Sequence, residues 1–255
     1  MFRTIEAGIT PNEPKIAEIR AALKAEPDNA ELWLQLGMEY SQSLFEESIK
    51  NYSMAIGLSP FNGEYYFHRG RKYLSTDQYA EAMADFHASL RLDCKDGQSW
   101  HYLGVALYYL EQYAEAARYF GKALEMNKKN GVDCVWPEVD WMWMSFMRAG
   151  DSQSAKQALD LVADDAYSSA GDMAYKKRVR LYKGVDSIET FMQNVSREDP
   201  LDTVTELYGA ANYYMFISPD PQKATELLDA TLAVKGYENA FGWKCAYHDR
   251  EAGRA

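Results

Sequence analysis

A spacing of 33 or 34 residues recurs in this chain, and it constrains the possible fold more than any other feature. Glycine marks the spacing at Gly37, Gly70 and Gly104. A repeat of this length is typical of short helical units that stack, because one such unit cannot bury its apolar face alone. Each unit also carries a small residue followed four positions later by an aromatic one: Ser48 and Tyr52, Ala82 and Phe86, Ala116 and Phe120.

Each unit is predicted to be a pair of helices. In the first unit, Trp33, Leu36, Gly37 and Tyr40 fall at positions i, i+3, i+4 and i+7, which places them on one face of a helix. Glycine on this face lets the second helix approach closely, and the small residue of the second helix does the same from the other side. The aromatic residue then fills the gap between neighbouring units. We therefore expect an all-α chain.

The motif WLQLGMEY, from Trp33 to Tyr40, resembles the first half of the tetratricopeptide repeat (TPR), whose pattern is W-x2-L-G-x2-Y, then A-x3-F, then P. The stretch from Trp100 to Leu107 matches the same half except at its last position. The second half of the pattern is matched by Ala82 with Phe86 and by Ala116 with Phe120.

The resemblance implies one continuous, right-handed α-solenoid of helix–turn–helix repeats. Residues 28–130 are predicted to hold three clear repeats, residues 131–165 a fourth, degenerate repeat, and residues 166–255 divergent helical repeats with a C-terminal capping helix. Residues 1–27 are predicted to form an N-terminal arm and a lone helix. The apolar stripe of that helix either caps the array or pairs with a second copy in a homodimer.

The fourth repeat departs from the pattern at two positions. Ala155 takes the small-residue position, but Leu159 stands where the clear repeats have an aromatic residue, and Trp143 stands where they have glycine. A bulky ring at the glycine position prevents the same close approach of the two helices. We therefore expect this unit to be splayed, with Trp143 marking the break between the regular array and the divergent half. Residues 127–136 are predicted to be an inserted loop.

The concave face of such a solenoid is lined by the first helix of each repeat, and residues beside its packing stripe are predicted to face the groove. Aromatic residues, Met and Arg, which are enriched in interface cores, are frequent there. The alternative is that the C-terminal helices of the chain cover part of this stripe. The predicted partner-binding groove consists of Leu34, Met38, Phe67, His68, Arg71, His101, Val105, Tyr108, Asp140, Met144 and Arg148.

The groove positions also exclude one activity that the resemblance suggests. TPR co-chaperones that grip the acidic C-termini of heat-shock proteins carry Lys, Asn and Arg at particular groove positions. We therefore expect no two-carboxylate clamp in this chain, because the matching positions hold Leu34, Met38, His68, His101 and Val105.

Charge and motifs narrow the possible functions further. The chain has 27 Lys and Arg against 38 Asp and Glu, a net charge of −11. Such an acidic chain is a poor nucleic-acid binder, because that binding depends on Lys and Arg releasing counterions. The sequence contains no phosphate-binding loop, no nucleophile elbow and no zinc-site spacing. We expect no enzyme activity, no cofactor and no metal.

The expected compartment is the cytoplasm. No apolar run is long enough for a membrane span, and the first residues carry neither a signal-like apolar stretch nor a cysteine for a lipid. Three widely separated cysteines also favour a reducing compartment. From about Leu181 onward, the stretch LYKGVDSIETFM resembles bacterial TPR scaffold lipoproteins of the cell envelope.

Two functions remain from the sequence. The first is a non-catalytic scaffold or adaptor whose groove takes a peptide or an amphipathic helix of a partner protein. The second is a regulatory protein that senses a small ligand or a signalling peptide in the same face.

Overall fold

The computed structural model describes residues 10–92, 97–132 and 135–254. The chain divides into two compact units, residues 8–123 and residues 124–255. The boundary lies inside helix α7 (Tyr113–Lys129), and the break in the repeat pattern at Trp143 stays a prediction. The predicted N-terminal arm lies largely outside the described residues. A single continuous solenoid stays a prediction.

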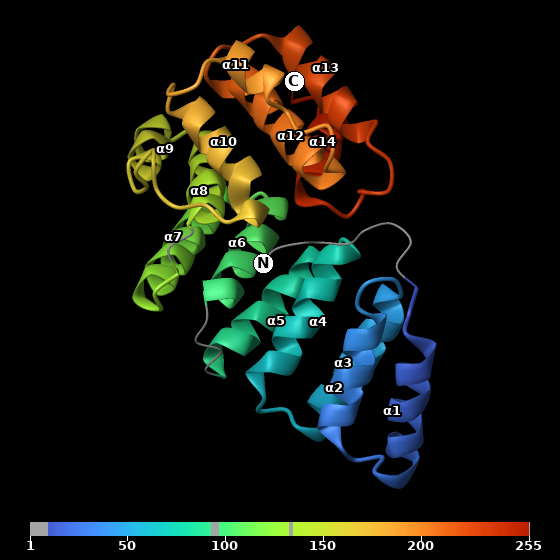
Figure 1. Ribbon diagram of the computed structural model, residues 1–255. Coiled ribbons are helices and arrows are strands. Elements are labelled where there is room, and N and C mark those ends of the chain that lie inside the picture. The colour runs from blue at the N-terminus through green and yellow to red at the C-terminus, as the bar shows by residue number, and fades with distance from the viewer. Residues whose placement is uncertain (1–9, 93–96, 133–134, 255) are drawn as a thin grey trace. The chain divides into compact units, whose positions relative to one another are not determined.

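The N-terminal unit is a series of antiparallel helix pairs preceded by one lone helix (Figure 1). Helices α2 and α3 pack together as the first repeat, and α4 and α5 pack together as the second. Helix α6 and the start of α7 belong to the third repeat. The bounds are α1 (Glu13–Ala25), α2 (Ala30–Tyr40), α3 (Phe45–Leu58), α4 (Gly63–Ser75), α5 (Tyr79–Arg91) and α6 (Gly97–Tyr109).

The three repeat glycines pack directly against the three repeat aromatics, which confirms the predicted register. A Cβ atom added to Gly70 would lie 2.9 Å from the Phe86 ring, and one added to Gly104 would lie 2.8 Å from the Phe120 ring. The same holds for Gly37 and Tyr52, at 2.5 Å. Each pair joins the first and second helices of one repeat, so the sequence spacing translates into close helix packing.

Asparagine side chains cap the first helices of the first two repeats. The side chain of Asn29 accepts hydrogen bonds from the backbone N–H groups of Glu31 and Leu32, and Asn62 accepts one from Glu64. These bonds satisfy N–H groups that have no partner within the helix. The first helix of each of these two repeats therefore begins at a defined residue, which fixes the side chains it presents.

The lone helix α1 caps the first repeat within the chain. Its apolar stripe, Ile16, Ile19 and Leu23, is buried against Leu36 and Tyr40 of α2. The stripe predicted to cap the array or to pair with a second copy is thus covered by the neighbouring repeat.

The C-terminal unit is also helical in its described residues, but its pairs are less regular. Helices α8 and α9 pack as the fourth repeat, α10 packs against α8 and α12, and α14 packs against both α12 and α13. Helix α7 continues to Lys129, so the first part of the predicted inserted loop is helical. The bounds are α8 (Trp136–Arg148), α9 (Ser152–Leu159), α10 (Met173–Tyr182), α11 (Ile188–Gln193), α12 (Pro200–Phe216), α13 (Pro221–Leu232) and α14 (Phe241–Glu251), with a 3-10 turn at Ala170–Asp172.

The helices are modest in length and mixed in composition. Within the described residues, no helix combines the length and the apolar character that crossing a membrane requires.

Candidate functional site

The predicted groove residues of the fourth repeat are buried in the core of the C-terminal unit, so their assignment to an open groove was wrong. Asp140 and Met144 are 0% and 1% exposed. The Nε of Arg178 on α10 lies 3.0 Å from the Oδ1 of Asp140. Arg148 forms an ion pair with Asp249 on α14. The divergent C-terminal helices thus cover this side of α8, which was the alternative that the sequence left open.

Burial also governs the protonation of this core. Desolvation raises the pKa of Asp140 to about 7, and the positive charge of Arg178 acts in the opposite direction. The sulfur of Met144 accepts a hydrogen bond from the same guanidinium, at 2.9 Å. These polar groups hold α8 and α10 together, and they are not available to a partner.

Most predicted groove residues of the N-terminal unit are also buried, which corrects their assignment to an open surface. Leu34 packs with Tyr52, Ala55, Ile56 and Tyr65 in one apolar cluster. A first helix is flanked by its own second helix and by the next repeat, so its apolar side chains turn into those contacts. The buried residues are Leu34, Phe67, His101, Val105 and Tyr108.

Three predicted groove residues keep solvent access, and we call Met38, His68 and Arg71 the Arg71 patch. Met38 is 37% exposed, and the His68 side chain is 18% exposed. Met38 and Arg71 each directly follow the repeat glycine of a first helix, so they occupy the same position in adjacent repeats. The patch is therefore the part of the predicted groove that stays accessible to solvent.

The charge of Arg71 is not neutralised by a carboxylate in the described part of the chain. Its guanidinium carbon lies 5.7 Å from the ring centroid of Phe67 and 5.2 Å from that of Tyr102. Cation–π contacts of this kind hold the guanidinium over an aromatic floor while leaving its N–H donors free for an anion.

His68 and Lys72 share the electrostatic surroundings of Arg71. Burial, together with the charges of Arg71 and Lys72, lowers the pKa of His68 to about 4. Burial and then Arg71 lower the pKa of Lys72 to about 7, and its amine donates to the carbonyl oxygen of Ser41 at 2.7 Å. Glu64 is the nearby carboxylate, 3.6 Å from the Nε2 of His68. At neutral pH, His68 is therefore uncharged and Lys72 is only partly protonated, so Arg71 supplies most of the positive charge around the patch.

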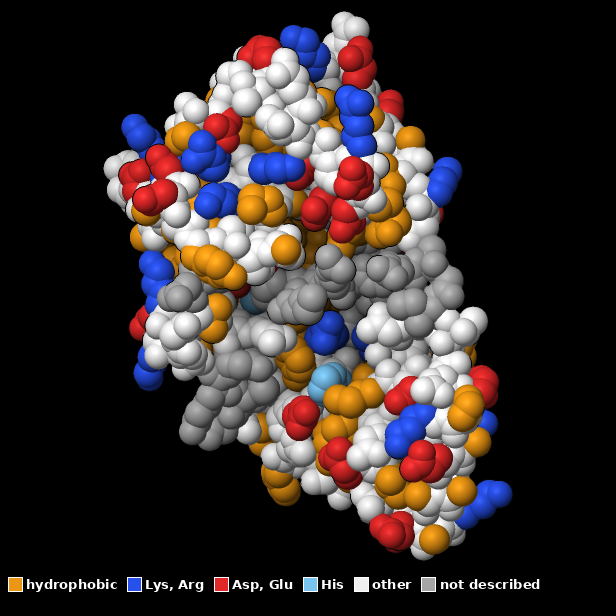
Figure 2. Space-filling model, viewed as in Figure 1, with side chains coloured by type: hydrophobic (Ala, Val, Ile, Leu, Met, Phe, Trp, Pro, Cys, Tyr) orange, Lys and Arg blue, Asp and Glu red, His pale blue; other side chains and the backbone are white. Residues whose placement is uncertain are grey.

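In the face shown in Figure 2, acidic and basic side chains are scattered among hydrophobic ones. Among the described side chains, His, Cys, Asp and Glu do not gather in groups of three that would hold a metal ion.

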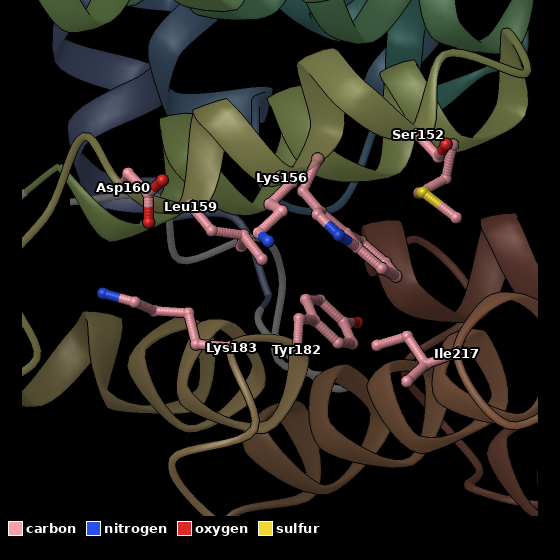
Figure 3. Close-up of a pocket in the computed structure, with 9 residues that line it drawn as sticks. Ser152, Lys156, Leu159, Asp160, Tyr182, Lys183 and Ile217 are labelled. Atoms are coloured by element: carbon pink, nitrogen blue, oxygen red, sulfur yellow. The ribbon is translucent and has the colours of Figure 1, made fainter.

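A second candidate site is a cleft of about 310 Å³ in the C-terminal unit (Figure 3). Its apolar wall includes Trp143 and Tyr182, whose rings stack with centroids 3.8 Å apart. The sequence did not predict this cleft. The one indication of it was Trp143, which stands at the position of the repeat glycine. The lining residues are Trp143, Met147, Ser152, Lys156, Leu159, Asp160, Tyr182, Lys183 and Ile217.

A third hollow, of about 390 Å³, lies between α1, α2 and α3. It is lined by Trp33, Leu36 and Tyr40 of the packing stripe, so it is not on the predicted groove side of α2. Arg20 reaches across it and donates to the hydroxyl of Tyr40 at 2.8 Å. This hollow is a seam between the capping helix and the first repeat.

Comparison with known proteins agrees with the helix-pair packing of the repeats. The family model described as tetratricopeptide repeat matches residues 97–130. Among solved structures, the chain is similar to YrrB, a TPR protein with an unusual peptide-binding site, with a TM-score of 0.51 and 19% identity over 91% of this chain and 97% of that one. The chain carries the tetratricopeptide-repeat fold. No curated protein matches it.

Other TPR structures give the same result. MamA has a TM-score of 0.51 and 19% identity, over 56% of this chain and 81% of MamA. The Cut9–Hcn1 hetero-tetramer of the APC/C gives a TM-score of 0.58 and 16% identity, and the match covers 92% of this chain and 46% of that one. At these identities the likeness concerns the fold. The matched residues 97–130 are the third repeat, and the glycine–aromatic contacts extend the register to the two repeats before it.

Proposed function

We propose that this protein is a non-catalytic scaffold or adaptor that binds an acidic segment of a partner protein at the Arg71 patch. The observation that carries the proposal is the guanidinium of Arg71, which lies over two aromatic rings and is not paired with a carboxylate in the described part of the chain. A carboxylate of a partner would form a charge-assisted hydrogen bond with it, which is stronger than a neutral one.

The neighbours of Arg71 favour a peptide over an isolated anion. Met38 offers an exposed, flexible apolar side chain at the equivalent position of the preceding repeat. Methionine adapts to varied apolar partners, and arginine beside aromatic rings is typical of interface cores. A segment that places an apolar residue near an acidic one would therefore use both ends of the patch. YrrB, with the same fold, is described as having a peptide-binding site.

The remaining expectations stay part of this proposal. The net charge of −11 disfavours nucleic acid as the partner. The three cysteines are widely separated in the sequence, which fits a reducing compartment such as the cytoplasm.

Charge reversal at Arg71 tests the proposal. The tagged protein, its Arg71→Glu variant and its Arg118→Glu variant are used to retain proteins from native lysate, and the retained proteins are quantified by mass spectrometry. Arg118 lies on α7 with 72% of its side chain exposed, so its variant carries the same charge change elsewhere. We expect the amount of at least one retained protein to be at least about tenfold lower with Arg71→Glu than with the wild type. The reason is that a hydrogen bond to a charged group contributes about 1.5–3 kcal/mol.

The control defines the contradicting result. If every protein retained by the wild type is retained equally by Arg71→Glu, the patch is not the docking surface. If Arg118→Glu loses the same protein, the effect comes from overall charge and not from the patch.

A second candidate function, sensing of a small ligand, is favoured by the cleft beside Trp143. A cleft of about 310 Å³ is at the lower end of the size range of small-molecule sites. This function and the scaffold function would use different units of the chain.

A further inference from the structure

The cleft beside Trp143 lies where the repeat pattern fails. Trp143 replaces the repeat glycine, and Leu159 replaces the repeat aromatic that would pack against it. Helix α9 is 8 residues long, whereas the second helices α3 and α5 have 14 and 13 residues. A shorter helix with a smaller side chain leaves the space between α9 and α10 incompletely filled. Figure 3 shows Lys156 and Leu159 on one side of this space and Tyr182 on the other.

The walls of the cleft are apolar and partly open to solvent. The Trp143 indole is held in place by its stack on Tyr182 and is itself 3% exposed. Ile217, at the C-terminal end of α12, is 39% exposed, although a large aliphatic side chain gains free energy when it is covered. An apolar group entering the cleft would therefore be in contact with a rigid aromatic wall and would cover Ile217.

The two lysines of the cleft differ in their pairing. The amine of Lys183 forms an ion pair with Asp164 and donates to the carbonyl oxygen of Val162 at 3.0 Å. Lys156 makes no ion pair within the described residues. In Figure 3 the Lys156 amine points into the space between the two walls, whereas Asp160 and Lys183 lie at one end of it.

We propose that this cleft binds a small apolar molecule or terminal group that carries one carboxylate. The apolar part packs against Trp143, Tyr182 and Ile217, and the carboxylate pairs with the amine of Lys156. Asp160 lines the cleft as well and disfavours a second negative charge at its own end. The volume of about 310 Å³ limits the ligand to roughly one aromatic side chain with its acidic group.

Isothermal titration of the full chain with 3-phenylpropionate tests the proposal. The neutral alcohol 3-phenylpropan-1-ol, which has the same apolar part, is the matched probe. We expect the acid to bind more tightly than the alcohol by up to about fivefold, which is the factor that one ion pair with an exposed lysine supplies. In Lys156→Gln, the acid is expected to bind no better than the alcohol.

Two further variants define the site. Lys235→Gln removes an exposed lysine between α13 and α14, and it should leave the affinity for the acid unchanged. Ile217→Asp, at a side chain that is already 39% exposed, should abolish binding without endangering the fold. Arg71→Glu lies in the other unit and should have no effect, so failure here and failure of the scaffold function are distinguishable.

The source of the carboxylate is decided by competition. A tetrapeptide of sequence Gly-Ser-Gly-Phe with a free C-terminus displaces the acid if the natural ligand is a peptide terminus. Failure to displace the acid identifies a free small molecule as the ligand. The proposal stands in both cases. Equal binding of acid and alcohol, unchanged binding in Lys156→Gln, or no binding of the acid at millimolar concentration would overturn the proposal.

Discussion

At the scale of single residues, Gly104 shows how one missing side chain sets the spacing of a helix pair. A Cβ atom at this position would lie 2.8 Å from the ring of Phe120, which is fully buried, so the close-packed ring would have to shift. Gly104→Ala is therefore expected to lower the free energy of unfolding by about 1–2 kcal/mol through overpacking. Chemical denaturation measures the change.

Gly57 offers the matched control for this substitution. It lies in helix α3, and a Cβ atom there would meet no heavy atom within 4 Å. Gly57→Ala should raise the free energy of unfolding by about 0.5–1 kcal/mol, because alanine is the better helix former. If both alanines shift stability in the same direction, the assigned packing of Gly104 is wrong.

His68 predicts a pH dependence of stability. Burial and the charges of Arg71 and Lys72 lower its pKa to about 4 in the folded chain, against 6.5 for an ordinary histidine. Between these values the unfolded chain binds a proton that the folded chain does not, so stability is lost as the pH falls from 6.5 towards 4. The loss attributable to His68 is about 2–3 kcal/mol.

The variant His68→Gln isolates this contribution. The free energy of unfolding is measured at pH 7 and pH 4.5 for both proteins, and the wild type is expected to lose more than the variant. Glu64 and Tyr52 also face the imidazole, and both remain in the variant. An equal loss in the two proteins would show that His68 protonates freely in the folded state.

The same residues show what a sequence can reveal. Gly104 and Phe120 are 16 positions apart in one repeat, so their contact follows from local periodicity. Asp140 and Arg178 are 38 positions apart on helices without a shared repeat register. Only the packing of α10 against α8 brings this pair together, so the sequence placed Asp140 in an open groove instead of the core.

At the scale of elements, α1 behaves as a cap whose apolar stripe is already used. Ile19 is 2% exposed and packs against the first repeat. Ile19→Ala should lower the free energy of unfolding by about 2–5 kcal/mol, or detach α1 alone if that helix unfolds locally. Hydrogen exchange of the α1 amides distinguishes these two forms of the loss.

The mass of the variant in solution addresses the alternative role of α1. Light scattering should give Ile19→Ala and the wild type the same oligomeric state, because the stripe is buried within the chain. A wild type that is dimeric and a variant that is monomeric would show instead that this helix joins two copies.

Helix α8 shows how a local departure from the repeat pattern is absorbed. The helical spacing of Val139, Met142 and Trp143 made α8 predictable as the first helix of the fourth repeat, and all three residues are buried. The stack of Trp143 on Tyr182 was not predictable, because it depends on where α10 packs. The consequence is a cleft in the C-terminal unit where a regular repeat would be filled.

At the scale of the whole molecule, the repeat register predicted the fold of the N-terminal unit but not its accessible surface. The spacing of glycine and aromatic residues predicts which helices pair. The pairing in turn predicts which residues of each first helix lie on its packing face. Solvent access depends on which neighbouring side chains turn inward, and this left Met38, His68 and Arg71 accessible from the larger predicted set. Function is therefore expected to concentrate on that small patch.

A photo-crosslinking amino acid at position 38 tests this central claim most directly. Met38 and Leu58 are each 37% exposed. Leu58 lies at the end of α3, the second helix of the first repeat, so it is a control of equal accessibility outside the patch. Irradiated in its native lysate, the chain labelled at position 38 should form a discrete adduct with a partner protein, and the chain labelled at position 58 should not. Equal adducts from both positions, or an adduct from position 58 alone, would contradict the proposal that the Arg71 patch is the binding surface.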